Sequence, residues 1–276
     1  MIKLVVDCTC EIDQGKANEL QIISIPMTVS FSNMEYLAGV ELSNTKFYEL
    51  LKQSKELPHT SQINESTYID IIKPLLDNGD EVFVMCLSSE LSGTFNSLRL
   101  AQEALNSKNL EILDTETTTF AYKALVYEAI KEIKKGTTLH QLKEKLEFLK
   151  SKLRLYAIID NVKYLIKGGR LSLAKGFVVG ALNIKPIVTI KDKVVKVVGN
   201  GIGYNIAKKN MCKFIKNIDY SMPAYFAHSN DVKKAEDIKH TMEQKFGFSF
   251  NEMCEIGPII GTHTGPGCVG IVYFEK

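Results

Sequence analysis

The sequence has little of what marks several specialised classes of protein. Of 276 residues only 7 are proline and 18 glycine, and there is no internal repeat, low-complexity segment or Pro- or Ser-rich linker. The formal net charge is +2, which gives no strong field toward nucleic acid or an anionic membrane. No apolar run approaches the roughly 18 residues of a membrane span, and the apolar start ends at Asp7, too soon for a signal peptide. We therefore expect a cytoplasmic globular protein that does not bind nucleic acid.

Clustered metal, disulfide and nucleotide motifs are also missing. Only Cys8 and Cys10 lie close together, and their C-x-C spacing differs from the C-x-x-C of common metal and redox motifs. The segment GNGIGY (199–204) resembles a dinucleotide motif but lacks its last glycine, and no G-x-S-x-G elbow occurs. The cysteines are at positions 8, 10, 86, 212, 254 and 268, and the histidines are at 59, 140, 228, 240 and 263. We expect the cysteines to be reduced thiols, and we expect no metal site and no cofactor.

Arginine is scarce as well. Of 34 basic residues only Arg99, Arg154 and Arg170 are arginine, so lysine is the ordinary surface cation of this chain. Only the guanidinium group offers a flat, bidentate fork to a carboxylate or phosphate. Each arginine is therefore a candidate for a specific role.

What the sequence does have, up to about residue 155, is short apolar runs that alternate with amphipathic stretches. This alternation predicts an α/β fold with a mainly parallel sheet. The expected strands are 2–6, 22–29, 81–87 and 110–113, and the expected helices are 44–53, 65–76, 93–106, 117–135 and 138–150.

After about residue 155 the pattern changes to strands and hairpins, which predicts a second, mixed α/β domain. A hairpin is expected to turn at Lys191-Asp192, and no linker separates the halves. We therefore expect two tightly packed domains, 1–155 and 156–276. The expected strands are 155–159, 185–190, 193–198, 223–229 and 267–274, and the expected helices are 203–217 and 231–246.

Hydroxyl groups are concentrated where the strand at 81–87 ends, in LSSELSGT (87–94). Ser92 is expected at or near the N-cap of the next helix, where free N–H groups and the helix dipole favour an anion. Gly93 would let a ligand approach the backbone. One alternative is that Ser92 only caps the helix, but a cap uses one hydroxyl and leaves the others unexplained.

Three further segments carry polar candidates. Thr60 and Ser61 follow Pro58 in a loop before a helix, which they could simply cap. His263 stands between two threonines in IIGTHTGPG (259–267), which we expect to be a loop that ends in a tight Gly-Pro-Gly turn. Arg170 follows Gly168-Gly169, of which Gly168 could close a helix, and it either faces an anion or is merely solvated. Downstream, ALNIKPIV (181–188) is expected to connect a helix to a strand, with Lys185 at the strand edge.

These blocks together resemble the DegV family and the fatty-acid-binding subunits of bacterial fatty acid kinase. The resemblance runs collinearly from residue 2 to 274. The segments that carry it are VDCTCEI (6–12), HTSQ (59–62), LSSELSGTFNSL (87–98), YLIKGGRLS (164–172) with LNIKPIV (182–188), and HTGPGCVGI (263–271).

The resemblance implies a protein that holds one long-chain fatty acid between its two domains. It implies that the carboxylate is bound by Thr60, Ser61, Ser92, Gly93 and Thr94, with His263 and Thr264 close by. It further implies that a separate ATP-dependent kinase subunit phosphorylates the bound acid, with Arg170 serving that transfer or the contact with the partner. The acyl phosphate would feed phospholipid synthesis, and this role allows transient contact with a membrane.

The chain departs from the family pattern at several places. Asp7-Cys8-Thr9 replaces the usual Asp-Ser-Thr, and Phe120-Ala121-Tyr122 replaces a glycine-containing stretch. Two other functions stay open from the residues alone. One is a lipid sensor without phosphotransfer, and the other is an acyl hydrolase that uses Ser92 and His263, although no third member of a triad is recognisable.

Overall fold

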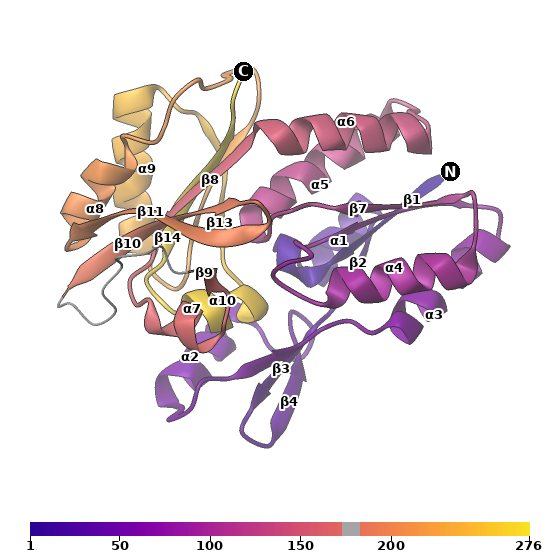
Figure 1. Ribbon diagram of the computed structural model, residues 1–276, viewed down its shortest axis with the longest axis horizontal. Coiled ribbons are helices and arrows are strands. Elements are labelled where there is room, and N and C mark those ends of the chain that lie inside the picture. Colours follow the sequence, from indigo (N-terminus) through magenta and orange to yellow (C-terminus); the bar gives the residue numbers. More distant parts are fainter. Residues whose placement is uncertain (173–182) are drawn as a thin grey trace.

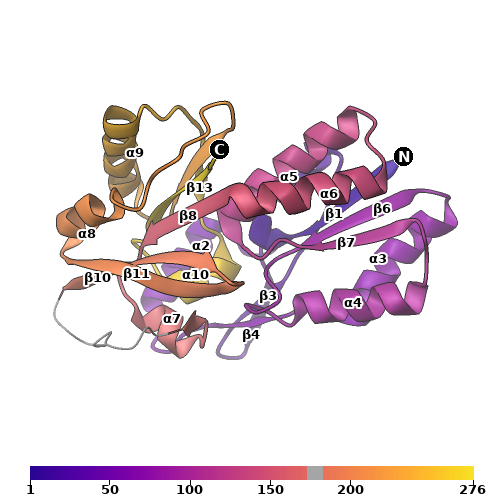
Figure 2. The same ribbon diagram turned by 45° about the horizontal axis from the view of Figure 1, so that its top comes forward.

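The computed structural model describes residues 1–172 and 183–276, so the first two residues of the expected connection at 181–188 lie outside it. The amino-terminal half is built on a parallel four-stranded sheet in the order β2-β1-β6-β7. In Figures 1 and 2, α3 and α4 cover one face of this sheet, and α5 and α6 cover the other. The strands are β1 (Ile2–Asp7), β2 (Ile23–Ile25), β6 (Glu81–Cys86) and β7 (Leu110–Asp114), and the helices are α1 (Gln14–Leu20), α3 (Glu65–Asp77), α4 (Thr94–Leu105), α5 (Thr119–Lys134) and α6 (Leu139–Lys152).

A small antiparallel sheet, in the order β4-β3-β5, branches from this half. It consists of β3 (Thr28–Phe31), β4 (Met34–Leu37) and β5 (His59–Ser61), with α2 (Asn44–Gln53) inserted before β5. The prediction of one strand over 22–29 is therefore wrong, because the segment belongs to two sheets. Pro26 separates the two strands, since it has no N–H to give to a continuous ladder.

The carboxyl-terminal half contains a mixed seven-stranded sheet in the order β13-β12-β14-β8-β10-β11-β9. The expected domain boundary at residue 155 falls inside β8, which is a strand of this sheet. The strands are β8 (Leu153–Ile158), β9 (Leu171–Ser172), β10 (Ile184–Lys191), β11 (Val194–Ile202), β12 (Ala224–His228), β13 (Phe250–Glu255) and β14 (Val269–Phe274). The helices are α7 (Lys163–Lys167), α8 (Tyr204–Met211), α9 (Val232–Phe246) and α10 (Pro258–Thr264).

One apolar core continues across both halves, from Leu4 on β1 to Val188 on β10 and Val272 on β14. Polar contacts also cross between the halves. The Lys123 ammonium pairs with Glu252 at 2.7 Å, and the Tyr48 hydroxyl donates to the Ile256 carbonyl at 2.8 Å. The predicted fold class, α/β with a mainly parallel amino-terminal sheet and a mixed carboxyl-terminal sheet, is confirmed.

Several expected boundaries differ in the structure. The helix predicted over 203–217 ends at Met211. The hairpin turns at Asp192-Lys193, one residue later than predicted, and both residues have positive φ. Among the described residues, no helix is both long and apolar enough to cross a bilayer.

Candidate ligand-binding site

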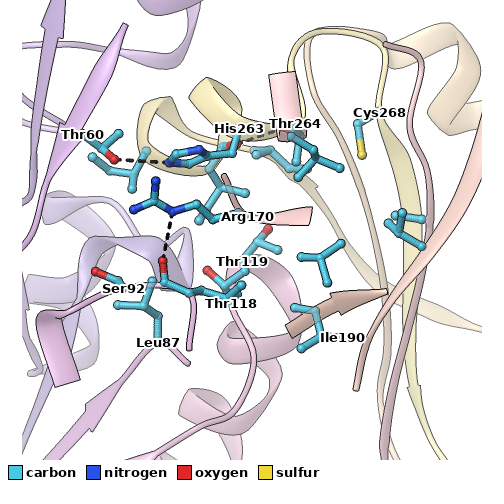
Figure 3. Close-up of a pocket in the computed structure, with 18 of the residues that line it drawn as sticks. Thr60, Leu87, Ser92, Thr118, Thr119, Arg170, Ile190, His263, Thr264 and Cys268 are labelled. Carbon is cyan, nitrogen blue, oxygen red and sulfur yellow. Dashed lines mark hydrogen bonds between the residues drawn. The ribbon is translucent and has the colours of Figure 1, made fainter. Parts of the chain in front are cut away.

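A cavity of about 170 Å³ lies between the two halves (Figure 3). This volume is about ten times the roughly 10–15 Å³ that one water requires. Most of its wall is apolar and comes from strands, helices and loops of both halves. The apolar lining residues are Met27, Leu87, Leu91, Phe120, Leu155, Ala157, Ile159, Leu165, Val188, Ile190, Val195, Ile256, Ile259, Ile260 and Cys268.

The polar part of the wall brings together residues from segments that are far apart in the sequence. Thr60 and Ser61 lie on β5, Ser92 and Gly93 precede α4, and Arg170 follows α7. His263 and Thr264 lie at the end of α10 and also line the cavity. Six of the seven predicted carboxylate-binding residues therefore line the cavity, and Thr94 is the one that does not. Arg170, which was predicted to serve phosphotransfer or partner contact, also lines it.

The loop after β6 is held in place by Asp7 at the end of β1. The buried carboxylate of Asp7 accepts from the Leu87 N–H at 2.9 Å and from the Thr9 N–H at 3.0 Å. Burial raises the pKa of Asp7, and these hydrogen bonds oppose the rise. Because β1 and β6 are parallel, both end at the same edge of the sheet. Asp7, from the segment VDCTCEI (6–12), therefore positions the hydroxyl-rich loop 87–94.

The hydroxyl groups of the loop have different partners. The Ser92 hydroxyl accepts from the Thr94 N–H at 3.2 Å and shares a hydrogen bond with the Thr94 hydroxyl at 2.9 Å. The Thr94 hydroxyl also accepts from the Ile63 N–H at 3.3 Å, so Thr94 links Ser92 to the backbone that follows β5. The Ser88 hydroxyl donates to the Lys193 carbonyl at 2.6 Å and ties the loop to the β10–β11 hairpin. Ser92 is thus the loop hydroxyl that both helps start α4 and lines the cavity.

Gly93 occupies the N-cap position of α4, next to the side-chain amide of Gln62. A Cβ atom on residue 93 would lie 2.0 Å from the Gln62 side-chain oxygen, so this amide would have to shift. Gln62 also lines the cavity, although it was not among the predicted site residues.

His263 is on a helix, so the prediction of a loop at this position is wrong. Pro258 starts α10 at its first turn, as proline commonly does. Gly265 ends the helix with φ +67, and a Cβ atom there would lie 2.3 Å from the Tyr164 ring. Seven residues are too few for a clear helical period, which is why the pattern suggested only the turn that follows.

The His263 ring is neutral and joins β5 to α10. Its Nε2 atom and the Thr60 hydroxyl are 3.2 Å apart. Its Nδ1 atom is buried, has no hydrogen-bond partner among the described residues, and packs against Gly168. Burial lowers the pKa of His263 to about 4, and the nearby Arg170 charge adds to this effect.

Arg170 is exposed and is held by backbone carbonyl groups. Its Nε atom donates to the Leu91 carbonyl at 3.3 Å, and another guanidinium nitrogen donates to the Gly168 carbonyl. Arg99 and Arg154 pair with Glu103 and Glu275. Within 1–172 and 183–276, Arg170 has no carboxylate partner, so part of its fork is available to an anion.

The apolar wall and two hydroxyl residues in it, Thr118 and Thr119, were not predicted from the sequence. Apolar residues that line a cavity have the same sequence pattern as residues that fill a core, so no local signal separates them. In the described part of the chain, no three His, Cys, Asp or Glu residues are placed to hold a metal ion, and the six cysteines are free thiols.

The fold and the site together define an α/β protein, built on a mainly parallel and a mixed sheet, with a largely apolar cavity that carries a group of polar residues. The family model described as "Uncharacterised protein, DegV family" matches residues 1–276. The chain therefore belongs to the DegV family.

Relatives match over the whole length. A DegV domain-containing protein of Listeria monocytogenes is 30% identical, with 100% of this chain and 99% of that protein covered. The crystal structure of DegV from Bacillus subtilis, described as a fatty acid binding protein, is 30% identical with a TM-score of 0.87, over 100% of this chain and 99% of that one. A DegV family protein from Thermus thermophilus, whose structure is described as showing fatty acid binding, is 25% identical with a TM-score of 0.88 and the same coverage.

Proposed function

We propose that this protein binds one long-chain fatty acid in the interdomain cavity and presents its carboxylate to an ATP-dependent kinase subunit. The observation that carries the proposal is the division of the cavity wall into one polar part and an extensive apolar part. The family members from Bacillus subtilis and Thermus thermophilus, described as fatty acid binding, support the ligand class.

The apolar wall supplies most of the gross affinity in this proposal. Burial of a methylene group contributes about 0.8 kcal/mol, so a long saturated chain contributes on the order of 10 kcal/mol. The cost of ordering the ligand offsets much of this. The polar part then fixes which end of the ligand enters first.

Hydroxyl groups suit a carboxylate that must later react. Thr60, Ser61 and Ser92 donate hydrogen bonds without forming a fixed ion pair, so the carboxylate keeps lone pairs for a new bond. Because His263 is neutral at physiological pH, it adds no positive charge that would trap the anion.

Arg170 suits the phosphoryl group better than the carboxylate. It borders a second hollow of about 460 Å³, which shares Thr60, Arg170 and His263 with the cavity and is also lined by Lys55 and Lys167. In the proposed step a carboxylate oxygen attacks the γ-phosphorus of ATP, the bond to the β,γ-bridging oxygen breaks, and ADP leaves. A guanidinium at this border would stabilise the charge on the transferred group.

The geometry gives the hydrolase alternative no support. The Nε2 atom of His263 lies against Thr60, no hydrogen bond joins His263 to Ser92, and Nδ1 faces no carboxylate in the described residues. A nucleophile activated by a base requires such a contact. A sensor without phosphotransfer is separated from the proposal by experiment.

The test is Arg170→Ala, assayed for palmitate affinity and for acyl phosphate formed with ATP and a fatty acid kinase subunit. Affinity should stay within about twofold, while acyl phosphate formation should fall about tenfold or more, as for a contact made only in the transition state. Arg99→Ala is the matched control and should change neither. Equal loss of both would assign Arg170 to the carboxylate, and wild-type protein that binds palmitate but supports no phosphorylation would favour the sensor.

A further inference from the structure

Two hydroxyl groups in the cavity wall have no hydrogen-bond partner among the described residues. Thr118 and Thr119 are 6% and 5% exposed, both line the cavity, and their Oγ1 atoms are buried. The Thr119 side chain lies near the Glu11 carboxyl and helps to lower its pKa, but the two groups are not within hydrogen-bond geometry. Most buried polar side-chain atoms in proteins have a partner, so each unpaired group requires an explanation.

The two residues form the start of α5, a helix of 16 residues. Thr118 is the N-cap residue, yet its side chain makes no capping hydrogen bond. The first N–H groups of the helix therefore lack a side-chain partner at an end where the dipole favours an oxygen ligand. Thr119 has φ +53, a left-handed conformation that is unusual for a β-branched residue. Hydroxyl groups and helix terminus together form a place for an oxygen atom.

This place and the proposed carboxylate site are built from different elements, because β5, the loop before α4, the segment after α7 and the end of α10 carry the carboxylate site. In the view of Figure 3, Thr118 and Thr119 lie between the group of Thr60, Ser92, Arg170 and His263 and the apolar residues Ile190 and Cys268. A carboxylate bound at the first group would leave the threonine hydroxyls beside the acyl chain. A plain methylene chain would exclude water from the two threonine hydroxyl groups and offer them no hydrogen bond. Each hydroxyl group left unpaired in this way should weaken ligand binding roughly tenfold.

We infer that the ligand carries a second oxygen along its chain, and that Thr118 and Thr119 select a long-chain hydroxy fatty acid. An alcohol both donates and accepts, and so does each threonine hydroxyl, so the three groups can satisfy one another. Among the described lining residues Arg170 is the one charged side chain, and no cation is left for a second carboxylate. The inference rests on the proposed fatty acid site.

The test compares stearate with monohydroxystearates that carry the hydroxyl at the third, tenth or twelfth carbon, each titrated into delipidated protein. At least one isomer should bind wild type about tenfold more tightly than stearate. Thr118→Val and Thr119→Val keep the shape of the side chain and remove the hydroxyl. Each should reduce this preference, and the double variant should bring it within about twofold, with stearate affinity retained or improved.

Thr117→Val is the matched control, because Thr117 is buried next to these residues but does not line the cavity. It should leave the preference unchanged. The inference is overturned if no isomer binds wild type more tightly than stearate, which needs no variant to fold, or if the preference survives the double variant. Failure of stearate and of all isomers to bind wild type would instead overturn the proposed function itself.

Discussion

At the scale of single residues, Ser92 combines a position at the start of a helix with a position in the cavity wall. Its hydroxyl accepts from the Thr94 N–H, and the residue also lines the cavity. The sequence predicted that Ser92 lies near a helix start, but it could not decide between a cap and an anion site. That decision depends on β5 and α10, which bring Thr60 and His263 to the same wall from distant parts of the chain.

Ser92→Ala should weaken fatty acid binding about tenfold. The lost hydrogen bond to a charged group is worth roughly 1–3 kcal/mol, and calorimetric titration of delipidated protein with palmitate measures the loss. Ser89→Ala is the matched control from the same loop, since Ser89 does not line the cavity. Unchanged affinity and unchanged ligand-bound melting temperature for Ser92→Ala would show that Ser92 serves only the helix.

His263 should make the stability of the protein depend on pH in acid. Burial lowers its pKa in the folded state to about 4 from the ordinary 6.5, so the unfolded chain takes up a proton first as the pH falls. The free energy of unfolding should therefore decrease from pH 6.5 down to about pH 4, by up to roughly 3 kcal/mol at about 1.4 kcal/mol per pKa unit.

The measurement is urea unfolding at pH 7 and pH 4.5 for wild type, His263→Gln and the control His140→Gln, whose histidine is exposed. Only His263→Gln should lose this contribution. The proteins must be compared with one another at each pH, because Glu11 also affects the pH dependence. Burial raises the pKa of Glu11 to about 8, so its contribution to the free energy of unfolding changes with the opposite sign between pH 4.5 and 8. The same pH dependence in all three proteins would contradict a neutral, buried His263.

At the scale of elements, the contact between α7 and α10 sets the position of His263. A Cβ atom on Gly168 would lie 2.4 Å from the His263 Nδ1 atom. Gly168 ends α7 with φ −72, so the space taken by the ring, and not the backbone conformation, requires glycine there. The adjacent Gly169 has φ +70, and a Cβ atom there would meet nothing within 4 Å, so its requirement is conformational.

These two glycines allow a matched comparison. Gly168→Ala should displace His263 and weaken palmitate binding about tenfold, since overpacking typically costs 1–3 kcal/mol. Gly169→Ala should strain the backbone by about 1–2 kcal/mol and lower the melting temperature by several degrees, with little change in affinity. Equal loss of affinity in both variants would show that the α7–α10 contact does not position the site.

The sequence predicted the longer elements well and the short ones poorly. The apolar period of α4 and the buried strand β6 are long enough to be recognised locally. In contrast α10 and β5 have seven and three residues, and they form because tertiary packing stabilises them. Both carry residues of the candidate site, so the location of the site could not be predicted from periodicity.

At the scale of the whole molecule, the cavity exists because two halves share one core that is incompletely filled at their junction. The hydroxyl-rich loop is tied to the β10–β11 hairpin by Ser88, and the Lys193 ammonium pairs with the buried Asp114 at 2.9 Å. Leu155, Val188 and Ile259 lie in apolar segments whose sequence pattern does not separate core from cavity wall, and they line the cavity. The fold class was predicted from strand–helix alternation in the sequence. The polar segments were grouped into one site first by the resemblance to the DegV family and then by the structure.

The central claim is that this cavity holds one long-chain fatty acid. The most direct measurement incubates the purified protein with palmitate or oleate, removes free ligand by gel filtration, and quantifies the fatty acid in a denaturing organic extract by mass spectrometry. We expect about one fatty acid per chain, including acid already carried by the protein as purified. An extract without fatty acid, before and after incubation, would contradict it.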